Sequence, residues 1–246
     1  MKIKILTLSV FLSSSVYASN TLHVYGPGGP APAMLETAKL FEKQEGIKVN
    51  VVFGPQSKWE ESAKNNADLI FSGSEIMLHQ QNKSFSLSKS EALYLRPSGI
   101  IVRKGNPKSI TGIETLIKSN LNILVVNGAG QSGLWEDIVG RSGNVTDINE
   151  FKENIVYAAD NSAQAIEFWE TNPEVDAWVI WSNWYDRVSS TSDLVAIEKD
   201  YMIYRPVSIS YTDKGMGKKE SLRFVEYLSS STASEIFLKY GWQKQW

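Results

Sequence analysis

The sequence lacks cysteine altogether and has only two histidines. The absence of cysteine excludes disulfide frameworks, thiol catalysis and thiolate metal sites. Long apolar runs are also missing. The N-terminal apolar run, residues 5–12, is much shorter than the roughly 20 residues of a membrane-spanning helix, and no later stretch approaches that length. We therefore expect a chain that is not embedded in a membrane.

Basic charge is in short supply as well. The 25 Lys and Arg residues are outnumbered by 27 Asp and Glu residues, which gives a formal net charge of −2. Such a balance argues against a surface that binds polyanions, so we expect no nucleic acid partner. The hydrophobic fraction of 42% is ordinary for a globular chain with a core.

The first residues have the pattern of a secretory signal. Lys2 and Lys4 precede the apolar run, and Val16-Tyr17-Ala18 offers small residues at a cleavage position. We predict a signal peptide over residues 1–18, export to the periplasm and a mature chain with formal net charge −4, because the signal contains two lysines and no acids. No cysteine follows the run, so we expect no lipid anchor.

Short β-branched or apolar runs alternate with helical patterns along almost the whole chain. This alternation predicts an α/β fold of mostly parallel sheets flanked by helices. The predicted strands are 22–25, 49–53, 68–71, 123–126, 155–158 and 177–181. The predicted helices are 30–45, 59–66, 113–119, 134–140, 163–170, 218–228 and 232–240, with capping boxes at Ser57–Glu60 and Thr111–Glu114.

Two long extended segments, residues 93–103 and 201–211, interrupt the alternation. They enclose a self-contained block of strands and helices, as two strands would when they cross between two lobes. We predict one lobe from residues 19–98 with 205–246, an inserted lobe from residues 99–204, and a ligand cleft between them. A single sheet of six or seven strands without a hinge is the alternative.

The turns between strands and helices are small and rich in glycine and hydroxyl groups. Such turns present backbone N–H groups at helix N-termini, which favour anions, and ligands of open α/β sheets bind at these strand ends. Each turn alone is also explained as a helix start, and Ser57 in particular by its capping box. The candidate ligand-binding residues are Gly28, Gly29, Gln56, Ser57, Ser72, Ser74, Gly130, Gln131, Ser132, Asn161 and Ser162.

Arginines stand on both crossing segments, in Leu95-Arg96-Pro97 and Tyr204-Arg205-Pro206. The rigid guanidinium fork suits carboxylate, phosphate or sulfate, so we add Arg205 to the candidate site. An ion pair between the lobes is the alternative for either arginine. Trp181 ends a predicted strand near the cleft and is the last candidate, whereas Trp178 is expected in the core.

Signals for catalysis, cofactors or metals are missing. Neither His23 nor His79 stands beside a nucleophile signature, and residues 130–133 are one residue short of the Gly-x-Ser-x-Gly elbow. The glycine-rich turn at residues 26–30 has neither dinucleotide nor P-loop spacing. No carboxylate and histidine grouping has metal-ligand spacing. We predict a binding protein that is not an enzyme and holds no cofactor or metal.

Several stretches, in order and over nearly the whole mature chain, resemble periplasmic binding proteins of the molybdate and sulfate type. The resemblance is closer to the accessory colonization factor family and its relatives among periplasmic surface antigens. The matching stretches are VYGPGGP (24–30), VVFGPQSKW (51–59), ADLIFSGSE (67–75), RKGNP (103–107), GAGQSGLWEDIVGR (128–141), DAWVIWSNW (176–184), AIEKDYMIYRP (196–206) and YLSSSTASEIFLKYGW (227–242).

The resemblance implies the two-lobed type II binding protein fold and a small oxyanion or organic acid as ligand. It places ligand loops on Gly28-Gly29, Gln56-Ser57, Gly130–Ser132, Asn161-Ser162 and Trp181. Gly28-Gly29-Pro30 stands where molybdate-type proteins have Ala-Ser-Leu, which argues against molybdate itself. The expected ligand is a sulfate- or molybdate-like oxyanion or a small organic acid such as citrate or phosphoglycerate.

Two roles remain open at this point. One is capture of a small anion for uptake through an ABC-type membrane permease, and the other is a surface adhesin or antigen that contacts host molecules. The family also suggests a homodimer. The sequence does not decide whether Asn82 or Asn144 is glycosylated.

Overall fold

The computed structural model describes residues 21–244. The predicted signal peptide lies outside the described residues. The described part contains nine strands, numbered in chain order: β1 Leu22–Gly26, β2 Val49–Phe53, β3 Leu69–Ser72, β4 Ser88–Arg103, β5 Ile123–Val126, β6 Ile155–Ala159, β7 Ala177–Trp181, β8 Ser192–Ala196 and β9 Tyr204–Tyr211. Its nine α-helices are α1 Ala31–Glu45, α2 Glu60–Asn66, α3 Glu75–Phe85, α4 Ile113–Lys118, α5 Leu134–Val139, α6 Val145–Glu153, α7 Ser162–Thr171, α8 Lys219–Leu228 and α9 Ser231–Lys239.

The strands are ordered β2-β1-β3-β9-β4-β7-β5-β6, with β8 also paired to β4. β1 runs parallel to β2 and β3, and β5 runs parallel to β6 and β7. The pairs that involve β4 and β9 are antiparallel. The predicted α/β class is thus confirmed, with its parallel strands in two separate groups.

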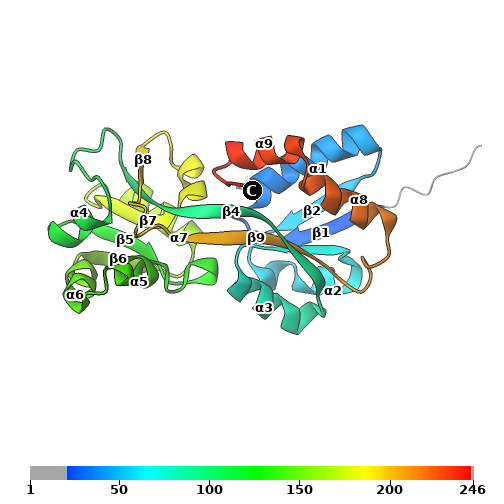
Figure 1. Ribbon diagram of the computed structural model, residues 1–246, viewed down its shortest axis with the longest axis horizontal. Coiled ribbons are helices and arrows are strands. Elements are labelled where there is room, and N and C mark those ends of the chain that lie inside the picture. Colours follow the sequence, from blue (N-terminus) through cyan, green and yellow to red (C-terminus); the bar gives the residue numbers. More distant parts are fainter. Residues whose placement is uncertain (1–20, 245–246) are drawn as a thin grey trace, which may run out of the picture.

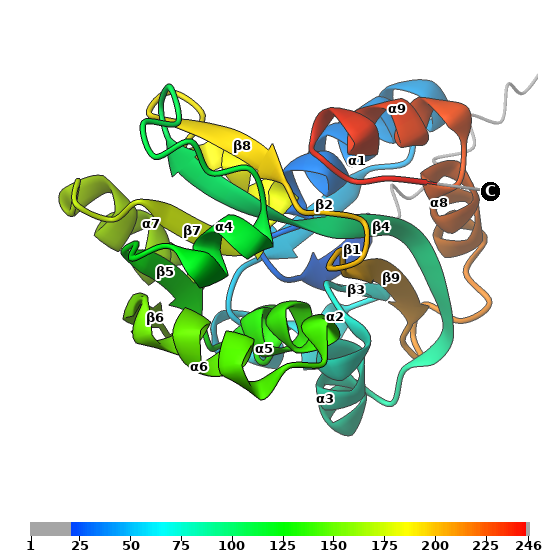
Figure 2. The same cartoon turned by 60° about the vertical axis from the view of Figure 1, so that its left-hand side comes forward.

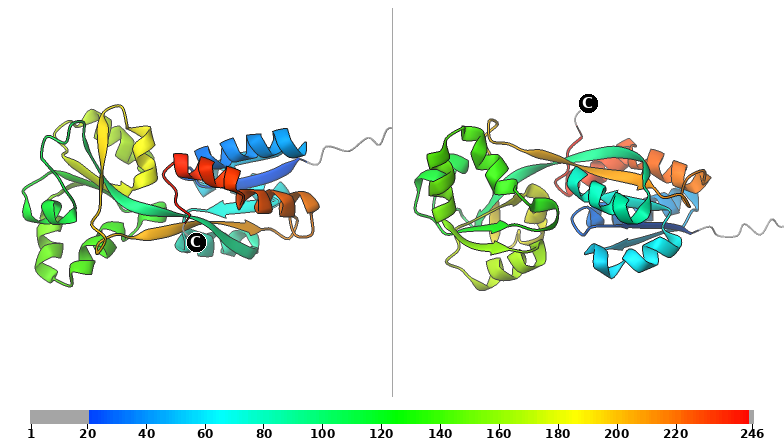
Figure 3. Two further views of the ribbon diagram at one scale, coloured as in Figure 1. Left: turned by 45° about the horizontal axis from the view of Figure 1, so that its top comes forward. Right: turned by 90° about the horizontal axis from the view of Figure 1, so that it is seen from below.

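The long strand β4 joins these two groups (Figure 1). Residues 88–97 pair with β9, and residues 98–103 pair with β7 and β8. Figure 3 shows β4 and β9 passing together between two bodies, and Figure 2 shows β8 against the far part of β4. We call the body with β1–β3, β9, α1–α3, α8 and α9 lobe 1, and the body with β5–β8 and α4–α7 lobe 2. The boundaries at residues 98/99 and 204/205 stay a prediction.

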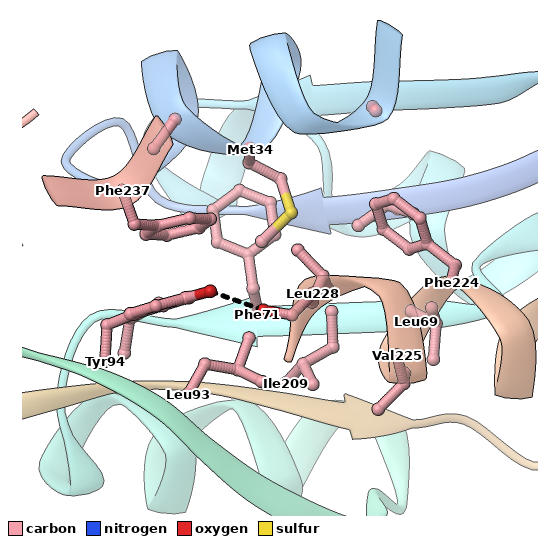
Figure 4. Packing of buried hydrophobic residues seen from close by; sticks show 14 of the residues in the cluster. Met34, Leu69, Phe71, Leu93, Tyr94, Ile209, Phe224, Val225, Leu228 and Phe237 are labelled. Carbon is pink, nitrogen blue, oxygen red and sulfur yellow. Dashed lines mark hydrogen bonds between the residues drawn. The ribbon is translucent and has the colours of Figure 1, made fainter. Parts of the chain in front are cut away.

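Each lobe has a core on both faces of its strands, because alternate side chains of a strand point to opposite faces. In lobe 1, Leu69 and Phe71 pack toward α1, α8 and α9, whereas Ile70 packs toward Trp59 of the α2 side. Figure 4 shows the first of these cores, where the Tyr94 hydroxyl donates to the carbonyl oxygen of Leu228 at 2.5 Å. In lobe 2, Trp178 is fully buried, as expected.

Both predicted capping boxes are wrong. Ser57 lies in a short 3-10 helix, Gln56–Lys58, and its side chain caps no helix; α2 begins after Trp59. At α4 the capping oxygens come from Glu198, which accepts hydrogen bonds from the backbone N–H groups of Ile113 at 2.8 Å and Glu114 at 3.3 Å. A tertiary contact therefore takes the role that the sequence pattern assigned to Thr111.

Within residues 21–244, every helix is too short or too polar to cross a bilayer.

Candidate functional site

The candidate site lies where the two lobes meet beside the crossing strands. Arg96 on β4 and Arg205 on β9 are register partners in the antiparallel pair, so their side chains leave the sheet on the same face. The turns after β1, β3 and β5 approach these arginines. Like charges directly opposite each other destabilise a sheet, which is a reason to look for an anion that would neutralise them.

Arg96 is the buried centre of the site. Its side chain is 4% exposed, and its guanidinium donates to the carbonyl oxygens of Gly73 in lobe 1 and Gly130 in lobe 2. The guanidinium carbon lies 4.6 Å from the centre of the Trp181 ring and 5.7 Å from that of Trp242. None of the ion pairs among residues 21–244 involves Arg96.

The charge of Arg96 is therefore balanced only by carbonyl dipoles and aromatic faces. Its Nε atom is buried and has no hydrogen-bond partner. Burial, and then the charge of Arg205, lower the pKa of Arg96 from its usual value. Both causes disfavour the charged form, and an anion bound beside the guanidinium would favour it.

Arg205 carries the second charge and is the partner in an ion pair between the lobes. Its Nη2 atom lies 2.8 Å from a carboxylate oxygen of Asp137 on α5. The Nη1 atom is buried without a hydrogen-bond partner, and the guanidinium carbon lies 5.3 Å from the centre of the Trp181 ring. The alternative of an interlobe ion pair thus applies to Arg205 and not to Arg96.

The ring of Trp181 makes cation–π contacts with both guanidinium groups. It is fully buried, and its indole N–H donates to the carbonyl oxygen of Gly130 at 3.1 Å. A cation over a desolvated indole face gains up to about 2 kcal/mol. Trp181 accordingly forms a wall of the site.

Three of the predicted turn residues, Gly29, Ser74 and Gly130, are brought to this centre. A Cβ atom on Gly29 would lie 3.7 Å from Nη1 of Arg96, and one on Gly130 would lie 3.0 Å from its Nη2 and 3.7 Å from the hydroxyl of Ser74. Ser74 is buried and caps α3 by accepting from the N–H of Met77 at 3.2 Å. The hydroxyl of Ser72, two residues before it, is buried and has no partner.

The other predicted residues lie apart from Arg96 or bond to one another. Gln56 contacts Glu60 and Ser84; Ser84 is ten residues beyond Ser74, which is about 15 Å along a helix. Ser57 is exposed. Nothing lies within 4 Å of a Cβ built on Gly28.

In lobe 2, Gln131 donates to the hydroxyl of Ser162 at 2.5 Å, and both side chains are buried. Asn161 caps α7 by accepting from the N–H groups of Ala163 and Gln164. Ser132 is exposed, and its hydroxyl lies 3.4 Å from the carbonyl oxygen of Asn127.

Two residues at this place were missed by the sequence reasoning. Gly73 supplies a carbonyl oxygen to Arg96. Asn183 is buried, donates to the carbonyl oxygen of Gly29 at 3.4 Å, and has a buried Oδ1 atom without a partner. The signal for Asn183 was available, because Ser182-Asn183 directly follows β7 as the other polar turns follow their strands.

Among residues 21–244, no three His, Asp or Glu side chains come together as a metal site would require. His23 lies beside Asn50, with 3.4 Å between their side-chain nitrogens, and His79 is exposed.

The family model of bacterial extracellular solute-binding proteins matches residues 22–243. The chain belongs to this family. Its structure is similar to that of Peb3 from Campylobacter jejuni, with 36% identity over 91% of this chain and 100% of the other and a TM-score of 0.82. PEB3 bound to L-phospholactate gives the same identity and coverage and a TM-score of 0.83.

More distant solved structures show the same fold. The substrate-binding domain of a putative molybdenum ABC transporter from Clostridium difficile is 16% identical over 92% of this chain and 99% of the other, with a TM-score of 0.70. The sulfate-binding protein SubI from Mycobacterium tuberculosis is 13% identical over 90% and 86%, with a TM-score of 0.72. These relatives confirm the predicted resemblance and fold. No curated protein matches the chain in sequence.

Proposed function

We propose that the protein captures a small, multiply charged anion in a cleft between its lobes and releases it unchanged. The observation that carries this proposal is the opposed pair of Arg96 and Arg205, of which Arg96 is buried without an acidic partner. Guanidinium groups suit phosphate and carboxylate through charge-assisted hydrogen bonds.

The proposed ligand class is a phosphorylated or multiply carboxylated small acid. Such a ligand offers two anionic groups to two guanidinium groups, and the similar protein PEB3 has been solved with L-phospholactate. The two guanidinium groups favour a compact acid over a metal ion, because they would repel a cation.

The proposed cellular role is uptake. We propose that residues 1–18 direct export to the periplasm, that lobes 19–98 with 205–246 and 99–204 close around the ligand, and that an ABC-type permease receives it. Support comes from the family and from the structural likeness to a binding domain of an ABC transporter. An adhesin that contacts host molecules, as a monomer or a homodimer, is the alternative.

Native mass spectrometry of the protein as purified, followed by denaturing release, tests the ligand class. The proposal expects a small phosphorylated or polycarboxylated acid, or calorimetric binding of L-phospholactate to protein from which bound molecules have been removed. A neutral or cationic species, together with no binding of phospholactate, citrate or sulfate, would overturn it. A pull-down of host surface proteins that is unaffected by anions would favour the adhesin.

A further inference from the structure

The ion pair between Arg205 and Asp137 places a negative charge beside the proposed anion site, where it would repel an anion. Its carboxylate lies 2.8 Å from the Nη2 atom of Arg205 and so faces the same guanidinium that we assign to the ligand. Arg205 is 15% exposed and Asp137 is 52% exposed. The Nη2 atom of Arg205 is thus paired with Asp137, while its buried Nη1 atom has no hydrogen-bond partner.

The position of Asp137 depends on the turn at residues 128–133. It lies in the first turn of α5, which directly follows the turn at residues 128–133, and its partner Arg205 comes from β9. The carboxylate therefore approaches the guanidinium only when lobe 2 is against the crossing strands, as it is in this structure.

Resting on the proposed function, we propose that Asp137 is a specificity-determining residue that limits how strongly the site prefers highly charged anions. It cancels one of the two positive charges and leaves Arg205 a single free edge for the ligand. Asp137 then weakens the binding of a ligand with few negative charges less than the binding of a ligand with more negative charges.

Two effects of Asp137 oppose each other, and their sizes decide the outcome. The ion pair favours contact between the lobes, but half-exposed pairs contribute little because water and salt screen them. The repulsion between Asp137 and a bound anion grows with each negative charge on the ligand. Removing the carboxylate should therefore strengthen binding, and more so for the more highly charged anion.

The test compares wild type with Asp137→Asn by calorimetry at pH 8, where a phosphate monoester, whose second pKa is near 6, carries its full charge. The probes are sulfate and L-phospholactate. We expect Asp137→Asn to bind sulfate about five- to tenfold more tightly and phospholactate about tenfold to thirtyfold more tightly, in proportion to ligand charge. Both gains should shrink as salt is added.

Glu136→Gln is the matched control, since Glu136 is the exposed neighbour of Asp137 on α5 and makes no ion pair among the described residues. It removes the same charge from the same turn and should change either affinity by less than about twofold.

The proposal is overturned if wild type binds phospholactate but Asp137→Asn binds it equally or more weakly, or if Glu136→Gln gives the same gain. A wild-type protein that binds none of these anions would instead sink the proposed function. Thermal unfolding of each variant verifies that the fold is kept.

Discussion

Arg96 on β4 and Arg205 on β9 face each other across one antiparallel strand pair and share the Trp181 ring, at 4.6 Å and 5.3 Å from its centre. Like charges directly opposite each other destabilise a sheet. Burial of Arg96 adds a desolvation cost. A bound anion would offset both costs, so on the proposed function we expect ligand binding and folding to be coupled through these two residues.

Replacing Arg96 by methionine should separate binding from stability. Arg96→Met removes charge-assisted hydrogen bonds worth about 1.5–3 kcal/mol each, so we expect phospholactate affinity to fall by a hundredfold or more, and Arg205→Met to lower it about ten- to a hundredfold. The free energy of unfolding without ligand should fall by less than the binding free energy, because the removed desolvation cost of the buried charge offsets part of the lost hydrogen bonds to Gly73 and Gly130.

Calorimetry and urea unfolding provide these two readouts. Arg223→Met is the control, since Arg223 pairs with Glu45 on the surface of lobe 1. Wild-type affinity in Arg96→Met would contradict the central role of this cation.

Glycine substitutions distinguish the positions whose added methyl group would meet Arg96 from those where it would meet nothing. Gly130→Ala places a methyl group 3.0 Å from Nη2 of Arg96, which must move the guanidinium. We expect affinity to fall about tenfold, the equivalent of 1.4 kcal/mol. Gly28→Ala, where nothing lies within 4 Å, should stay within about twofold. Equal effects of the two substitutions would refute this geometry of the site.

A partly buried ion pair in lobe 1 contributes to stability independently of the site. Asp68 is fully buried, accepts a hydrogen bond from the N–H of His23 at 2.9 Å and pairs with Lys218. Lys218→Met should lower the free energy of unfolding by about 1–3 kcal/mol, because the buried carboxylate loses its cation but keeps the hydrogen bond from His23.

The exposed pair of Lys239 with Glu36 gives the comparison, and Lys239→Met should lower the free energy of unfolding clearly less, because water and salt screen the pair. Urea titrations that show the same loss for both variants would contradict this assignment. Anion affinity should remain unchanged in both.

Export can be tested on the protein recovered from the periplasm. We expect a mature chain that begins at Ser19, because Val16-Tyr17-Ala18 is the small-residue site that follows the apolar run. Intact mass measures this directly. A mass that corresponds to residues 1–246 would show that no cleavage takes place.

Local pattern was sufficient for much of the fold. The strands at 49–53, 123–126 and 177–181 begin and end where the alternation of residue types predicts. The sequence did not reveal α3, whose residues EIMLHQQNKSF have weak apolar periodicity, nor the short edge strand β8. Their structure depends on packing against neighbours: β8 exists because β4 offers it backbone partners.

For the site, the sequence by itself determined which kinds of groups are present: small polar turns at strand ends, and one arginine before a proline on each crossing segment. Only the tertiary structure decided that Arg96 and Arg205 are opposed, that Gly29, Ser74 and Gly130 surround Arg96, and that Gln56 lies far away. The reason is that turn chemistry is local, whereas the register of β4 against β9 joins residues more than a hundred positions apart, and a shift of one residue would turn either arginine to the other face.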